Sequence, residues 1–263
     1  MRLITYGYLV YLLAPIVLLL IGAFGDHWSN TLLPEGLTWR WFITVWEDAT
    51  YRNAMVTTFK LALTTCLINI LLVVPLVYGV TLKFPAVAQS ITRLLVMLPV
   101  AVPQLVIGFA FILAFSTAML PWLGSPWLLV AGHVVVTFPY LFYTVYADIE
   151  ASPLKAYERM AQSLGAAEWQ RFVHLYLPLV YRSVFTGSLT VAALSIGEFE
   201  LSNLISGFMT QPYPVVLIQA FYRTTGFACA ATLFLLSLAL LFSLFSTLVQ
   251  WRLGRSSSRE LPQ

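Results

Sequence analysis

The chain has 263 residues, of which 60% are hydrophobic and 10% charged, with a formal net charge of +3. This composition excludes an ordinary soluble domain, in which about a quarter of the residues are charged. Apolar runs of about 20 residues, each long enough to cross roughly 30 Å of hydrocarbon, recur along the chain. We therefore expect an all-α membrane protein in a lipid bilayer, and the small charge excess gives no reason to expect a nucleic-acid partner.

Six membrane-spanning helices are predicted within a single transmembrane domain over residues 1–263. Their approximate ranges are 4–24, 53–82, 91–119, 127–147, 181–205 and 227–251. The second and third ranges exceed the length of a straight crossing, which favours a tilt or a kink. A cytoplasmic loop is expected at about 148–181, and a short polar tail at 252–263.

The distribution of Lys and Arg predicts the orientation, because cytoplasmic loops carry an excess of these residues. With both termini inside, ten of them fall in cytoplasmic segments and only Arg40, Arg52 and Arg223 fall outside. The first span is interpreted as an uncleaved signal anchor. Its removal would leave five spans and place the C-terminal arginines on the wrong side.

Two stretches outside the spans are expected to be helical. Residues 26–52 contain "TWRWFITVWED", in which Trp39, Phe42 and Trp46 share one helical face. This pattern is typical of a helix in the headgroup layer, and a contact surface for an extracellular partner is the alternative. Residues 207–226 contain an apolar run too short to span, and predict a re-entrant or surface-lying helix.

Two prolines interrupt the third span, in "MLPVAVPQLVIG". Pro99 and Pro103 each remove a backbone donor, which kinks or breaks a helix. Irregular backbone at membrane depth is tolerated only where protein or a water-filled cavity surrounds it. Pro99, Pro103 and the adjacent Gln104 are therefore candidates for lining a substrate pathway, and an ordinary packing kink is the alternative.

Charged residues within spans are costly and usually functional. Lys60 lies in the second span, and Glu198 and Glu200 lie in the outer half of the fifth, near Asn203. The two glutamates do not share a helix face unless the helix is distorted near Gly197. These four polar residues are candidate pathway residues. Three readings stay open: an ion pair between Lys60 and Glu198, direct contact of Glu198 with substrate, and snorkelling of Lys60.

The sequence contains no recognisable catalytic constellation. None of the glycines is followed by lysine, so a phosphate-binding loop is not expected, and neither H-E-x-x-H nor a nucleophile–base pair appears. His133, within the fourth span, is interpreted as a hydrogen-bonding packing residue, and no metal site is expected. The energy for any active process must therefore come from a gradient or from another chain.

The cytoplasmic loop contains the stretch with the most soluble character, "ERMAQSLGAAEWQRFVHLYLPLV" at 158–180. The spacing predicts a helix with an apolar face, a turn at Gly165, and a second amphipathic helix ended by Pro178. The apolar face comprises Leu154, Tyr157, Met160, Ala161 and Leu164, followed by Trp169, Phe172, Val173 and Tyr176 in the second helix. The loop could simply cap the bundle, but equal numbers of acidic and basic residues around an apolar stripe favour insertion into a partner's groove.

These residues also resemble a known motif. Gly165 is followed by nine residues, Leu175, one residue, Leu177 and Pro178, which is similar to the G-(x9)-I-x-L-P frame of the EAA loop in membrane subunits of bacterial ABC-type importers. Ala161, Leu164 and Ala166 match its opening. "SIGEF" at 195–199 is similar to a fifth-span motif of the polyamine, aminoethylphosphonate and ferric-iron branch.

The loop departs from the motif at one position. Arg159 stands where the motif has Glu, and Glu158 comes one residue earlier. An acidic contact with an ATPase would therefore come from Glu158 at a different angle, or would be absent. The resemblance implies an ATPase-docking set made of Tyr157, Glu158, Arg159, Ala161, Leu164, Gly165, Ala166, Trp169 and Phe172.

The resemblance implies a type I ABC importer permease fold, with six transmembrane helices and a cytoplasmic coupling helix in the bacterial inner membrane. The expected partners are a second, different permease, two ATPase subunits that carry ATP and Mg²⁺, and an extracytoplasmic solute-binding protein. The chain itself is expected to bind no cofactor and to be no enzyme. It would move a small polar solute, such as a polyamine or aminoethylphosphonate, by alternating access. The alternative is a gradient-driven secondary transporter, which should show repeated halves.

Overall fold

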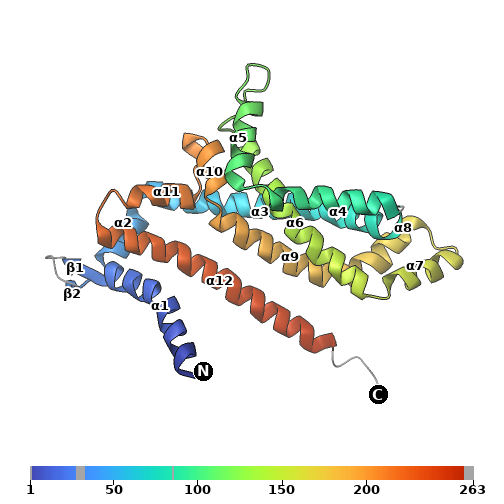
Figure 1. The fold of residues 1–263 in the computed structure, drawn as a ribbon, viewed down its shortest axis with the longest axis horizontal. Coiled ribbons are helices and arrows are strands. Elements are labelled where there is room, and N and C mark those ends of the chain that lie inside the picture. Colours follow the sequence, from blue (N-terminus) through green and yellow to red (C-terminus); the bar gives the residue numbers. More distant parts are fainter. Residues whose placement is uncertain (1, 28–32, 85, 258–263) are drawn as a thin grey trace. The chain divides into compact units, whose positions relative to one another are not determined.

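The computed structural model describes residues 2–27, 33–84 and 86–257, and this part of the chain is mostly helical (Figure 1). Two compact units divide the chain. Unit 1 comprises Met1–Thr58 and Gln211–Leu241, and unit 2 comprises Phe59–Thr210 and Phe242–Gln263. The chain passes between the units at three points: within the long helix α3 (Ala49–Leu82), between Thr210 and Gln211, and within the long helix α12 (Thr225–Ser257).

Five helices are long and apolar enough to cross a membrane, and a sharply bent pair makes a sixth candidate span. The five contain α1 (Arg2–Phe24), α3, α6 (Pro126–Ala151), α9 (Leu177–Gly197) and α12. Each predicted span thus has a helical counterpart. Because α12 extends to Ser257, the first half of the predicted polar tail is helical, and residues 258–263 lie outside the described part.

The third predicted span is broken rather than kinked. It consists of α4 (Ala86–Ala101) and α5 (Gln104–Phe115), which meet at an angle of 98°. Pro103 lies immediately before α5, and its ψ of 138° is extended rather than helical. The backbone therefore does not continue in the direction of α4. The expectation of a proline-induced break is confirmed, and the bend is larger than an ordinary packing kink.

The fifth span is also interrupted. Helix α9 ends at Gly197, and α10 (Glu200–Ile205) begins after a short extended segment at Glu198. The predicted distortion near Gly197 is confirmed. The interruption separates Glu198, whose backbone is extended, from Glu200, which begins a new helix.

Pro178 does not end the second loop helix, so this prediction was wrong. Helix α8 (Glu168–Arg171) continues through a π-helical turn, η1 (Phe172–Tyr176), directly into α9. Pro178 occupies the first turn of α9. There the wider π-helical turn changes the hydrogen-bond register, so the missing donor of proline is tolerated.

Unit 1 contains a cluster of aromatic rings. Beside α1 it contains a hairpin of β1 (Gly25–His27) and β2 (Glu35–Leu37), the short helix α2 (Arg40–Glu47) and α11 (Tyr213–Ala220). The rings of Trp39 and Phe42 contact each other, as do those of Phe42 and Phe234, and those of Trp46 and Phe234. The shared aromatic face of α2 is thus confirmed, whereas its place in the headgroup layer stays a prediction.

Unit 2 is built on close contact between α6 and α9. A Cβ at Gly187 of α9 would lie 2.5 Å from Cδ1 of Leu141 in α6, so a larger residue there would force the leucine side chain to move. Helices α5 and α10 lie side by side (Figure 1), and a Cβ added at Gly108 of α5 would lie 2.5 Å from Cδ1 of Leu204 in α10. The helices of the loop that was predicted to be cytoplasmic, α7 (Leu154–Ser163) and α8, lie at one end of α6 and α9 (Figure 1).

Candidate functional site

Two regions of unit 2 contain most of the residues that the sequence singled out. The first is the coupling segment, residues 154–171, made of α7, a turn and α8. The second is the break between α9 and α10 with its surroundings. Each region is built from side chains that come from more than one helix.

The turn of the coupling segment depends on Gly165. Its φ of +80° lies in the left-handed region, which side chains with a Cβ disfavour. The N–H of Gly165 donates to the Gln162 carbonyl, and the N–H of Ala166 donates to the Ala161 carbonyl, both at 3.0 Å. This pair of bonds is a Schellman motif, which stops α7 and turns the chain toward α8. The predicted turn is confirmed.

The predicted apolar stripe of the coupling segment is divided between two faces. Leu154 is fully buried, whereas Met160, Leu164 and Trp169 are 62%, 86% and 71% exposed. Tyr157 is also exposed. The prediction of a single apolar face is therefore wrong. Leu154 packs into the core and holds α7 in place, whereas Met160, Leu164 and Trp169 face outward.

The side chain of Glu158 points into the protein and is buried. Its Oε1 accepts a hydrogen bond of 2.8 Å from Nε of Arg171 and one of 3.2 Å from the Tyr78 hydroxyl. Its Oε2 has no hydrogen-bond partner within the described part of the chain. Because Arg171 and Tyr78 cover this buried carboxylate, the structure favours the second of the two expectations, in which the acidic contact with an ATPase is absent.

Further contacts connect the same group to the end of α3. Lys83 lies 3.3 Å from Glu168 and 4.0 Å from Oε1 of Glu158. Arg171 also donates from a terminal nitrogen to the Ala166 carbonyl, at 2.5 Å. We call this set the loop clamp; it comprises Tyr78, Lys83, Glu158, Glu168 and Arg171. It fastens both helices of the coupling segment to the adjacent end of the α3 helix.

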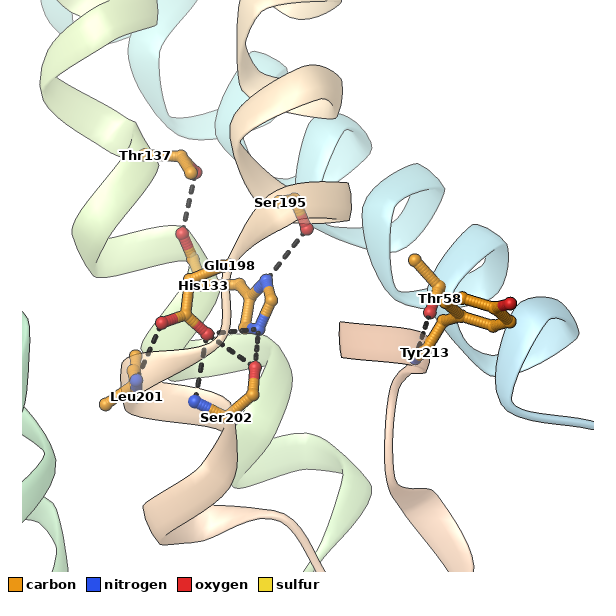
Figure 2. A network of polar contacts seen from close by, with 8 residues as sticks. All are labelled: Thr58, His133, Thr137, Ser195, Glu198, Leu201, Ser202 and Tyr213. Carbon is orange, nitrogen blue, oxygen red and sulfur yellow. Dashed lines mark hydrogen bonds and ion pairs between the residues drawn. The ribbon is translucent and has the colours of Figure 1, made fainter. Parts of the chain in front are cut away.

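At the second region, Glu198 caps the helix that follows the break. Its Oε1 accepts from the backbone N–H of Leu201 at 2.6 Å, and its Oε2 accepts from the backbone N–H of Ser202 at 2.9 Å (Figure 2). The Ser202 hydroxyl also donates to Oε2 at 2.5 Å. The buried carboxylate is thus satisfied by the unpaired donors of a helix N-terminus, where negative charge is stabilised.

His133 of α6 joins the two sides of the break. Its ring lies between Ser195 of α9 and Ser202 of α10, and its two nitrogens are each 2.8 Å from a serine oxygen (Figure 2). Because the Ser202 hydroxyl donates to Glu198, its oxygen must accept from Nε2–H of His133. A neutral ring then accepts at Nδ1 from the Ser195 hydroxyl. The interpretation of His133 as a hydrogen-bonding packing residue is confirmed.

Of the three readings left open for Lys60 and Glu198, the ion pair between them is not the one that the structure shows. Lys60 is exposed on α3, and within the described chain it has no ion-pair partner. The carboxylate of Glu198 is instead occupied by α10 and lies 3.5 Å from Nε2 of His133. A carboxylate that already has three hydrogen bonds gains little from a distant exposed ammonium group.

A cavity of about 400 Å³ lies beside the break. It brings together three of the predicted pathway residues, Gln104, Glu198 and Glu200, with Thr137 and Tyr140. The other predicted residues lie elsewhere: Asn203 is exposed and does not line this cavity, Pro103 precedes α5, and Pro99 lines a separate apolar cavity of about 500 Å³.

Sequence reasoning missed several members of both regions. Thr137 and Tyr140 of the cavity lie three residues apart on α6 and carry no distinguishing pattern. In the loop clamp, Tyr78 and Lys83 are 80 and 75 residues from Glu158, so only the folded structure brings them together. The polar character of His133, Ser195 and Ser202 within predicted spans was the one sequence signal for the network at the break.

Comparison with known proteins identifies the family. A sequence model of the family "Binding-protein-dependent transport system inner membrane component" matches residues 72–255. The chain is 24% identical to the putative 2-aminoethylphosphonate transport system permease protein PhnV of Salmonella typhimurium, over 94% of this chain and 92% of that protein. It is 26% identical to the sulfate transport system permease protein CysW of Escherichia coli, over 94% and 86%.

A solved structure supports the same fold. The crystal structure of a bacterial alginate ABC transporter, in complex with an alginate pentasaccharide-bound periplasmic protein, superposes with a TM-score of 0.73 and 17% identity. The superposition covers 95% of this chain and 91% of the other. The expected all-α importer permease fold is confirmed, and the family match favours it over a gradient-driven secondary transporter. The chain belongs to the family of inner membrane components of binding-protein-dependent transport systems.

Proposed function

We propose that this importer permease takes a small polar solute from an extracytoplasmic binding protein and moves it inward by alternating access, driven by ATPase subunits docked on the coupling segment. The observation that carries the proposal is the outward face of that segment. Three large apolar side chains, Met160, Leu164 and Trp169, are more than half exposed there. Exposed apolar clusters of this kind mark surfaces that another protein covers.

The loop clamp supplies a route from the docking surface to a span. Glu158 and Arg171 connect the two loop helices to each other, and Tyr78 and Lys83 connect them to α3. A movement imposed on the coupling segment would therefore be transmitted to α3 as a rigid displacement, because packed and charged networks shift between discrete arrangements. ATP and Mg²⁺ belong to the docked ATPases in this proposal.

The cavity beside the α9–α10 break is the proposed position of the solute during passage. It combines an amide, hydroxyl groups and the carboxylate of Glu200 with apolar walls, which suits a small polar molecule. The relatives carry the names of different solutes, a phosphonate and sulfate. We favour an aminoethylphosphonate-like solute over a polyamine, because both named solutes are oxyanions and the cavity can accept an amine at Glu200.

The proposed assembly contains this permease, a second and different permease, two ATPases and the binding protein. In this proposal both termini and the coupling segment lie on the cytoplasmic side, which the distribution of Lys and Arg supports. The break and its cavity then lie toward the outer half of the membrane, on the side that receives the solute.

Co-purification tests this proposal. The tagged chain is expressed with the products of its neighbouring genes and isolated in mild detergent, and the ATPase in the complex is quantified. Leu164→Glu should lose the ATPase, whereas the matched control Phe208→Glu should retain it; the two parent side chains are 86% and 87% exposed. Absence of an ATPase from the wild-type complex, or its retention by a correctly inserted Leu164→Glu variant, would contradict the proposal.

A further inference from the structure

The charges of the coupling segment and its flank are almost fully compensated within the chain. Of the six charged side chains between residues 150 and 171, all but that of Arg159 lie in an ion pair that the structure describes. The pairs are Lys155 with Glu150 at 2.6 Å, Arg171 with Glu158 at 2.8 Å, and Lys83 with Glu168 at 3.3 Å. Arg159 has no ion-pair partner within the described residues, so it gives the segment one uncompensated positive charge.

Arg159 lies on the outward face of α7. The inward face is formed by Leu154 and Glu158, which are both buried. Ala156, Arg159 and Ser163 follow one another at spacings of three and four, on the opposite side of the helix, and all three are exposed. On this face the large side chain of Arg159 is flanked by the small side chains of Ala156 and Ser163. The next residue in the sequence, Met160, is also exposed. A partner that contacts the outward face of α7 must also cover Arg159.

Covering a guanidinium group without a counter-charge is unfavourable, because the group loses its hydration. The nearest carboxylate along the chain, that of Glu158, cannot supply the counter-charge, because it faces inward and is bound by Arg171. The partner must therefore provide it. A carboxylate suits this position best, since the planar guanidinium can donate two parallel hydrogen bonds to its oxygens.

We propose that the ATPase subunit presents an aspartate or glutamate to Arg159, so that this permease selects its ATPase through a charge pair. The inference rests on the proposed function, because it specifies the chemistry of the surface that docks on the coupling segment. Apolar contacts at Leu164 and Trp169 provide most of the binding, and the charge pair sets the choice of partner. Complementary charges typically contribute in this way to specificity and association rate.

The first test is the salt dependence of ATPase binding to the permease in nanodiscs of neutral lipid. Arg159→Gln is compared with Lys155→Gln, which removes an equal charge from the same helix, but one that Glu150 already compensates. We expect Arg159→Gln to bind on the order of fivefold more weakly at low salt and to lose most of the salt dependence. Lys155→Gln should retain the salt dependence of the wild type. Equal behaviour of the two variants would overturn the inference.

The second test is a charge reversal. Arg159→Glu should weaken binding by about tenfold or more, and changing one acidic residue of the ATPase docking surface to arginine should restore it. Wild-type binding by Arg159→Glu at every salt concentration would overturn the charge pair, as would failure of every such reversal to restore binding. Loss of binding by Leu164→Glu in the same series would show that the proposed docking site still stands.

An anionic lipid headgroup is the other group that could neutralise Arg159. The same affinities are therefore measured in nanodiscs that contain an anionic phospholipid. The charge pair predicts that the difference between wild type and Arg159→Gln is present in neutral lipid. A difference that appears only with anionic lipid would assign Arg159 to the membrane surface and overturn the inference.

Discussion

Nε of Arg171 donates a hydrogen bond of 2.8 Å to Oε1 of Glu158, and both side chains are 9% exposed. The pair joins the two helices of the coupling segment, and the Tyr78 hydroxyl extends it to α3. A buried pair of this kind depends on both partners, because removal of one leaves an uncompensated charge. The arrangement makes Glu158 part of the internal structure and leaves the docking surface to other residues.

Breaking this pair from one side should be more damaging than removing it altogether. Arg171→Met leaves the buried carboxylate of Glu158 without its main partner and should clearly lower the free energy of unfolding. The double variant Glu158→Leu with Arg171→Met should be more stable than Arg171→Met alone. Thermal unfolding of the purified permease measures both. Purely additive losses in the double variant would contradict the pairing.

Glu198 should protect the first turn of α10. Glu198→Ala removes the acceptor for the backbone N–H groups of Leu201 and Ser202, and hydrogen exchange of these amides should accelerate by about tenfold. The matched control is Glu200→Ala, because within the described structure Glu200 accepts no hydrogen bond from this turn. Equal acceleration in both variants would mean that the cap at Glu198 is unimportant.

Gly165 should tolerate some residues better than others. A Cβ there would meet no atom within 4 Å, so the cost of substitution comes from the φ of +80° alone. Gly165→Val should destabilise the protein by about 1–2 kcal/mol, and Gly165→Asn by clearly less, because asparagine adopts the left-handed region more readily. Unfolding measurements of the two variants decide this, and equal losses would show that the turn is not the cause.

The pair of Asp48 and Arg223 in unit 1 should make stability depend on pH. Burial alone would raise the pKa of Asp48, but the hydrogen bonds from Arg223 and Thr50 and the charge of Arg223 lower it below the ordinary value of 3.8. The pair therefore stabilises the folded state above that value, and the stabilisation is lost as the pH falls through the lower pKa of the folded state.

The variant Asp48→Asn tests this dependence. At pH 7 it should be less stable than wild type by less than about 1 kcal/mol, because Arg223 is 43% exposed and solvent screens the pair. The difference should shrink at strongly acidic pH. Glu47→Gln, which changes an exposed neighbour, is the control. If the stability difference between wild type and Asp48→Asn grew on acidification, it would contradict a lowered pKa of Asp48 in the folded state.

The sequence predicted those features that depend on local composition. Hydropathy located the helices of all six spans, the prolines located the break before Gln104, and Gly165 located the turn of the coupling segment. Each signal lies within the segment that it describes, so no knowledge of the tertiary structure was needed. The exception was Pro178, which lies in the first turn of α9, where proline is compatible with a helix.

The sequence could not predict the partners of individual charged groups. Glu158 looked available for a partner protein, because nothing in the pattern showed that Arg171 would fold back onto it. An ion pair between Lys60 and Glu198 was one open reading because the two lie at similar depth, but His133 and the start of α10 surround the carboxylate. Such contacts join helices that are distant in sequence, and periodicity within one helix does not reveal them.

Docking of an ATPase on the coupling segment is the central claim, and site-specific photo-crosslinking in the membrane tests it most directly. A photoreactive amino acid replaces Leu164 in one version of the importer and Phe208, which is equally exposed, in another. We predict an adduct with the ATPase from position 164 and none from position 208. An active importer that forms no ATPase adduct from position 164, or forms equal adducts from both positions, would contradict the claim.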